Sequence, residues 1–131
     1  MAINDDLLCQ QFARIIGGQA GFAGGKCVAT INRDDIEATI LGKRFRVTTS
    51  FSFESRDNKI GRALCLGRAA LLQKEVNDFI LVIRNQGITV SSIHHEWLFE
   101  KPRLIYVNIE AVEEPLVFAK KVKRALTTIS N

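Results

Sequence analysis

The residues with the clearest chemical potential are the two histidines of the chain, His94 and His95, and the acid Glu96 that follows them. Imidazole and carboxylate groups bind divalent metals and transfer protons. The segment precedes a turn centred near Pro102, where the guanidinium of Arg103 could clamp an anion. We therefore take this region as the candidate site.

The strand expected after this turn supplies further polar side chains. Over residues 104–112 apolar residues alternate with polar ones that include Asn108 and Glu110, so the two sets point to opposite faces. If His94 and Glu96 share the polar face, they meet this pair across neighbouring strands, with Cβ atoms about 4.5–5.5 Å apart. That spacing suits a proton-transfer pair, or a metal ion with His94, Glu96 and Asn108 as ligands.

The facing of the histidine strand depends on one local irregularity. The apolar residues of 88–90 have the same parity as His94, so a regular strand would turn His94 toward the core. A β-bulge near Ser91 and Ser92 would turn His94 and Glu96 to the polar face instead. Without the bulge, His95 would take that place.

The composition is that of one ordinary globular domain spanning residues 1–131. The chain holds 47% hydrophobic and 24% charged residues, and its length suffices to bury a core without staples. The net charge of +4 is mild, and the basic residues of 120–124 lie opposite an apolar stripe, as on a solvated helix face. Since the chain lacks a phosphate loop and interleaved aromatic residues, nucleic acid is not expected as a partner.

The sequence also predicts the cellular location of the protein and the redox state of its cysteines. The first six residues lack a positive segment and an apolar core, and no apolar run approaches the ~18 residues of a membrane span. We therefore expect a cytoplasmic protein without a signal peptide or a membrane partner. Cys9, Cys27 and Cys65 are widely separated and form no CxxC pair, so buried reduced thiols are expected.

Hydrophobic periodicity predicts three helices separated by strands. The helices run from about Asp5 to Gly17, from Gln73 to Gly87 and from Pro115 onward. The glycine-rich residues 19–25 are expected to form a loop. The predicted strands are a hairpin of residues 26–32 and 36–41, then 46–54, a short strand 62–66 that Gly67 ends or bulges, 88–98, and 104–112.

The order of these elements indicates an α+β fold. Residues 5–41 and 73–112 share the order helix, glycine stop, strand, turn, strand, and residues 28–33 would match 90–95. This pseudo-repeat of a helix and β-hairpin unit favours two layers, with a mostly antiparallel sheet and three helices on one face.

Several blocks of sequence from residue 51 onward recur in a known family. They are Phe51-Ser52-Phe53, Ala63-Leu64-Cys65-Leu66-Gly67, Glu75-Val76-Asn77, Gln86-Gly87-Ile88-Thr89-Val90, Ile93-His94, Trp97-Leu98 and Pro102-Arg103-Leu104-Ile105-Tyr106. On these blocks the chain resembles the bacterial LppY/LpqO-type domain of unknown function. The resemblance implies no established activity.

The chain departs from that family at the histidine positions. The family commonly reads His-Asn-His here and carries another histidine in the return strand. This chain keeps His94, but it has His95 in place of Asn, Glu96 in place of the second His and Asn108 in place of the return-strand His. Carboxylate and amide oxygens also bind metals, so the resemblance implies a weakened metal site with these ligands on one face.

The leading hypothesis is a small-ligand or metal-ion binding domain that uses the open sheet face. Its binding residues would be His94, Glu96, Asn108, Glu110 and Arg103, and a divalent metal is the cofactor to consider. An alternative is an interaction or regulatory module that pairs through the open face, as in a homodimer. A third is a metal-assisted hydrolase using His94 and Glu96, although the residues leave open whether any reaction is catalysed.

Overall fold

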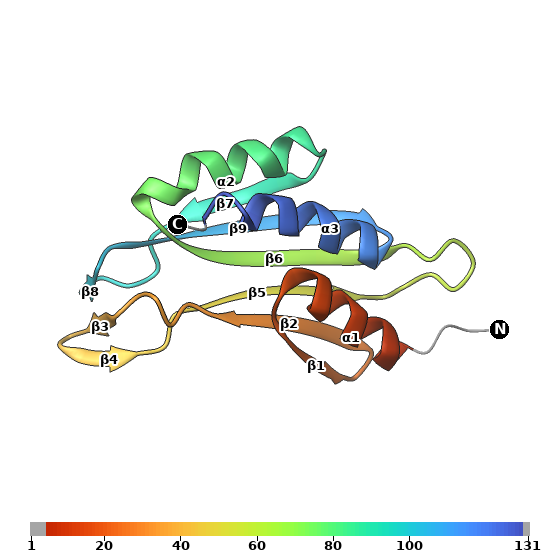
Figure 1. The fold of residues 1–131 in the computed structure, drawn as a ribbon, viewed down its shortest axis with the longest axis horizontal. Coiled ribbons are helices and arrows are strands. Elements are labelled where there is room, and N and C mark those ends of the chain that lie inside the picture. Colours follow the sequence, from red (N-terminus) through yellow and green to blue (C-terminus); the bar gives the residue numbers. More distant parts are fainter. Residues whose placement is uncertain (1–4, 130–131) are drawn as a thin grey trace.

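The computed structural model describes residues 5–129 and consists of three helices and nine strands within that range (Figure 1). The expected absence of a signal peptide rests on the first six residues, and four of these, residues 1–4, lie outside the described range. In the described range, no helix is long and apolar enough to cross a membrane. The elements are α1 (Asp5–Ile16), β1 (Gln19–Ala23), β2 (Lys26–Asn32), β3 (Ala38–Ile40), β4 (Lys43–Phe45), β5 (Thr48–Glu54), β6 (Ala63–Leu72), α2 (Gln73–Asn85), β7 (Thr89–His94), β8 (Glu100–Lys101), β9 (Leu104–Glu113) and α3 (Pro115–Leu126).

The predicted α+β architecture is confirmed. Six antiparallel strands form one sheet in the order β1-β2-β5-β6-β9-β7, and the three helices lie on one side of it (Figure 1). Apolar side chains of all three helices pack on that face in one continuous core, in which Phe12, Phe53 and Phe118 are in ring contact. The amphipathic periodicity of each helix therefore identified its buried face correctly.

The repeated unit is present, although its residues align differently from the prediction. Each of α1 and α2 is followed by an edge strand, β1 or β7, that turns back into an inner strand, β2 or β9. The predicted match of residues 28–33 with 90–95 is wrong, because it pairs an inner strand with an edge strand. The error follows from taking residues 19–25 as a loop.

Residues 19–25 contain strand β1 and the turn into β2, which corrects the predicted loop. Gln19 faces Thr30 and Ala23 faces Lys26, so β1 pairs with β2 along its whole length. All of its residues are exposed, so β1 shows no alternation of apolar and polar residues. Edge strands of this kind are formed by backbone bonds and are hidden from pattern analysis.

The predicted hairpin of residues 26–32 with 36–41 is also wrong. Strand β3 pairs with β4 and β8 in a separate three-stranded sheet, in the order β4-β3-β8. The apolar residues Ile36 and Ala38 pack against Leu104 and Tyr106, on the sheet face opposite the helices. Burial there, and not pairing with β2, determines where this segment lies.

Strand β6 continues through Gly67, where the sequence predicted an end or a bulge. It pairs with β9 without interruption, from Ala63 facing Glu113 to Leu72 facing Leu104. A Cβ atom at Gly67 would lie 2.6 Å from a ring carbon of Phe51 and 2.7 Å from a side-chain carbon of Ile109. The glycine is thus required by close packing within a central strand.

A buried ion pair joins the segment after β2 to the start of α2. Arg33 donates to both carboxylate oxygens of Glu75, at 2.7 and 2.9 Å, and also to the carbonyl of Ala70 at 3.1 Å. Both charged side chains are buried. Burial opposes the charge on Arg33, yet its bonds to Glu75 and to Asp35 raise its pKa overall. The guanidinium of Arg33 therefore stays charged although it is buried.

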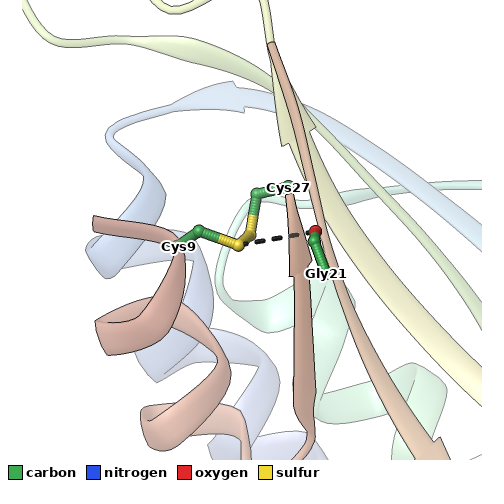
Figure 2. Close-up of a disulfide and its surroundings, with 3 residues drawn as sticks. All are labelled: Cys9, Gly21 and Cys27. Atoms are coloured by element: carbon green, nitrogen blue, oxygen red, sulfur yellow. Dashed lines mark hydrogen bonds between the residues drawn. A yellow bond between two sulfur atoms is a disulfide. The ribbon is translucent and has the colours of Figure 1, made fainter. Parts of the chain in front are cut away.

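A disulfide bond between Cys9 and Cys27 links α1 to β2, so the expectation of three reduced thiols is wrong (Figure 2). The sulfur of Cys9 also lies 3.6 Å from the carbonyl oxygen of Gly21 in β1. Cys65 is the free cysteine, and burial raises the pKa of its thiol to about 12. Spacing along the chain could not show that α1 crosses directly over β2.

Candidate functional site

A β-bulge in β7 determines which side chains reach the candidate site. Val90 faces Ile109 whereas Ser92 faces Asn108, so Ser91 is an extra residue on the β7 side of the ladder. His94 then faces Tyr106 and lies on the sheet face away from the helices. The predicted bulge near Ser91 and Ser92 is therefore confirmed.

This second face of the sheet is only partly open. Tyr106 and Leu104 on β9 and Ala70 on β6 are buried beneath Ile36 and Ala38 of the segment that leads into and includes β3. The small sheet therefore covers the end of the face that lies nearest to β8. Asn108 and Glu110, further along β9, are left uncovered.

Arg68 of β6 organises the charged groups at the boundary between the covered and uncovered parts. Its guanidinium carbon lies 4.2 Å from the ring centroid of Tyr106 and one of its nitrogens is hydrogen-bonded to Glu96. The imidazole of His94 stacks on the same tyrosine, with ring centroids 5.9 Å apart, and its Nε2 lies 3.5 Å from Oε1 of Glu96. Burial would raise the pKa of Glu96, but the bond and charge of Arg68 lower it overall, so this acid stays ionised.

Beside Arg68 the uncovered face is hollowed into a depression of about 280 Å³, which we call the polar depression. Asn108 contributes its side chain there, and its Oδ1 is buried without a hydrogen-bond donor among the described residues. An unpaired buried acceptor is costly, which marks a position where a donor from a ligand would be stabilising. The lining residues are Lys26, Ser50, Ser52, Leu66, Gly67, Arg68, Ser91, Asn108, Ile109 and Glu110.

The predicted site residues are only partly brought together. His94 and Glu96 are in contact, while Asn108 and Glu110 line the polar depression beside them. Arg103 does not line it: its guanidinium donates to the carbonyl of Leu98, 3.4 Å away, within the turn before β9. His95 does not line it either: its Nδ1 lies 2.9 Å from the carbonyl oxygen of Leu104.

Arg68 was missed from the sequence because the strand was predicted to end at Gly67, whereas β6 continues through it to Leu72. The pairing of β6 with its two neighbouring strands provides a signal by which Arg68 could have been recognised. Arg68 faces Asn108 on one side and Ser50 on the other, so a polar row crosses three strands. A single charged residue within a central strand is unusual and marks a functional or paired group.

The metal expectation has limited geometric support. Across residues 5–129, no three side chains of His, Cys, Asp or Glu are grouped so that they could hold a metal ion. The carboxylate of Glu96 is bonded to Arg68, whose positive charge opposes a cation at the same place. A metal bound by His94, Glu96 and Asn108 would have to displace this guanidinium.

The comparisons with known proteins identify a family. Residues 10–128 match the family model described as Domain of Unknown Function (DUF1259). The chain belongs to this family. The DUF1259 match covers all the strands and helices except the first residues of α1, so the candidate site lies wholly within the domain. No curated protein and no solved structure matches the chain.

The ionisation of Tyr106 gives a direct test of this arrangement. Burial raises the pKa of its hydroxyl, although a hydrogen bond from Trp97 and the charge of Arg68 act against it. Because it is the only tyrosine in the chain, absorbance near 295 nm should show titration above the ordinary value of about 10. The folded state then holds the proton more tightly than the unfolded state, so the free energy of unfolding should fall as pH rises above about 10. Titration at the ordinary value would contradict the burial of this ring.

Proposed function

We propose that the protein binds a small polar ligand in the polar depression on the uncovered face of the sheet. The observation that carries the proposal is the buried Oδ1 of Asn108, which has no hydrogen-bond donor among residues 5–129. The carboxylate of Glu110, two residues along the same strand, provides a second acceptor beside it. A ligand that presents hydrogen-bond donors to this pair would satisfy the unpaired atom.

Charged groups around the depression suggest the rest of the ligand. Arg68 is bonded to Glu96, and Lys26 lies 3.8 Å from Glu54 in a partly exposed pair. Exposed pairs of this kind are weak, so a ligand carboxylate or phosphate could take either cation as its partner. A small molecule with both donor and anionic groups therefore complements the site.

Asn108→Leu provides the test. Without ligand, the variant should be more stable than the wild type by about 1–2 kcal/mol, because it removes an unsatisfied acceptor. In thermal-shift assays with amino acids, sugars, nucleosides and dicarboxylates, a compound should raise the wild-type Tm and leave that of Asn108→Leu unchanged. Asn77→Leu, an exposed position on α2, is the matched control and should bind like the wild type.

Two outcomes would count against this function. Equal shifts in the wild type and Asn108→Leu would place the ligand elsewhere. If no compound shifts the wild type, and native mass spectrometry of the protein as purified reveals no retained small molecule, small-ligand binding has no support.

Metal binding is the second candidate, favoured by the 3.5 Å approach of His94 Nε2 to Glu96 Oε1. Zn²⁺ and Mg²⁺ therefore join the panel, with His94→Ala/Glu96→Ala as the variant. Equal metal binding by this variant and the wild type would contradict a metal site at His94 and Glu96. Sedimentation of the same samples tests the interaction-module alternative, since a strict monomer does not pair through its sheet face.

The family resemblance and the location are also proposals. We keep the LppY/LpqO-type assignment as the finer description within the domain of unknown function. For the location, we propose an oxidising compartment in place of the expected cytoplasm, because a structural disulfide such as Cys9–Cys27 persists where thiols are not kept reduced.

A further inference from the structure

Four large apolar side chains are exposed together where the small sheet ends the molecule. Leu41, Trp97, Leu98 and Phe99 are exposed by 74%, 42%, 76% and 60%. The backbone N–H of Leu41 donates to the carbonyl of Phe99 at 3.2 Å, so the turn after β3 lies directly beside the segment before β8. Figure 1 shows β3, β4 and β8 together at one end of the molecule, remote from α1. We call these four residues the apolar tip.

The backbone conformation of Leu41 is unfavourable for leucine, so this residue does not contribute to the stability of the turn. Leu41 and Gly42 form the turn between β3 and β4, with φ values of 52° and 80°. Such turns favour glycine, asparagine and aspartate, because other side chains are strained at positive φ. A leucine that is both strained and exposed to water therefore has its most direct explanation in a contact outside the chain.

The segments that adjoin the apolar tip carry several cations. Lys43, Arg44, Lys101 and Arg103 are all exposed in the adjoining strands and turn. Among the carboxylates of the same region, Glu37 lies 3.5 Å from Arg44 in an exposed pair. Glu100 is buried, and its Oε1 accepts from the backbone N–H of Leu104. The tip thus combines four exposed apolar side chains with exposed cations in the adjoining strands and turn.

We propose that the apolar tip binds an anionic lipid surface. Leucine and phenylalanine side chains would enter the boundary between headgroups and acyl chains, while Trp97 would lie at headgroup level, where tryptophan is enriched. The surrounding lysines and arginines would pair with the negative headgroups. This departs from the expectation of no membrane partner, which considered spanning segments alone, and it is independent of ligand binding in the polar depression.

The only tryptophan of the chain lies within the tip, so its fluorescence reports directly on the contact. With vesicles of phosphatidylglycerol and phosphatidylcholine in equal amounts, the emission of Trp97 should shift to the blue and the protein should co-sediment. Lipids brominated on the acyl chains should quench the emission. Vesicles of phosphatidylcholine alone should bind much more weakly, and salt should weaken binding to the anionic ones.

Matched variants separate insertion from general attraction. Leu98→Ser/Phe99→Ser, which retains Trp97, should lower the affinity for anionic vesicles about tenfold or more, since it removes two inserted side chains. Ile60→Ser is the control: this residue is 65% exposed and lies near Lys59 and Arg62, in the loop between β5 and β6 at the other end of the molecule. The affinity of this control for anionic vesicles should stay within about twofold of the wild type, because an isolated apolar side chain does not form a membrane-binding surface.

The charge-reversal variant Lys43→Glu/Lys101→Glu, which leaves the apolar residues intact, should also lose binding to the anionic vesicles.

Three results would overturn the proposal. These are a lack of binding to the anionic vesicles, equal loss of binding in the Ile60 control and the tip variants, and a dimer in solution that the tip substitutions dissociate. The last would identify a second copy of the chain as the occupant of the tip.

Discussion

Glu75→Leu should lower the free energy of unfolding by about 3–5 kcal/mol, measured by urea denaturation at neutral pH. The substitution leaves the Arg33 guanidinium buried without the carboxylate that accepts two of its bonds, at 2.7 and 2.9 Å. It also removes the acceptor of the backbone N–H of Leu72, 2.8 Å from Glu75, at the start of α2. The Arg33 guanidinium and the backbone N–H at the start of α2 therefore lose the same carboxylate acceptor.

The double variant Arg33→Met/Glu75→Leu distinguishes a lost partner from lost packing. It should recover much of the stability, because two apolar side chains of similar length fill the site without a buried charge. Asp34→Asn is the exposed control: this acid lies 3.6 Å from Arg46, and both side chains are largely exposed, so the loss should stay below about 1 kcal/mol. A small effect of Glu75→Leu would mean that Asp35, bonded to the same guanidinium, suffices alone.

Reduction of the Cys9–Cys27 disulfide should destabilise the protein by about 3 kcal/mol, because the bond closes a loop between residues 18 apart in sequence. Guanidinium unfolding with and without a phosphine reductant measures the difference. Cys9→Ala/Cys27→Ala should show the lower stability under both conditions, since it has no bond to reduce. Equal stability of the oxidised and reduced wild type would contradict a structural role for the bond.

Thiol counting provides an independent check of the same bond. The unfolded, unreduced protein should present a single reactive thiol, Cys65, and the reduced protein three. The folded protein should present none at neutral pH, because burial raises the pKa of Cys65 to about 12 and keeps reagents out. Three reactive thiols in the unreduced chain would show that the disulfide does not form.

The parts of the fold that follow from periodicity were predictable. The three helices bury one apolar stripe each, and β9 alternates between buried and more exposed residues from Val107 to Glu110, so local pattern and tertiary burial agree there. Strand β1 was not predictable because it is exposed on both faces, and β3 was misplaced because its apolar residues pack on the second face of the sheet. Neither fact is encoded within a window of a few residues.

The part of the candidate site that was predictable is the part on β7, the segment directly after it, and β9. A conflict of parity within β7 left two orientations of His94 open, and the family resemblance favoured the bulge that the structure contains. The partner of Glu96 was not predictable, because Arg68 comes from β6 and meets that acid through a register that depends on the whole sheet. The disulfide was missed for the same reason, as it depends on how α1 crosses β2.

The bulge at Ser91 has a consequence for comparing this chain with its relatives. A relative that lacks one residue between Val90 and His94 would turn its histidine segment over, toward the helices, while its motif letters remained identical. Conservation of the letters alone is therefore no sign that two members share this surface. The length of this short segment, counted residue by residue, is the property by which members of the family should be sorted before their histidines are equated.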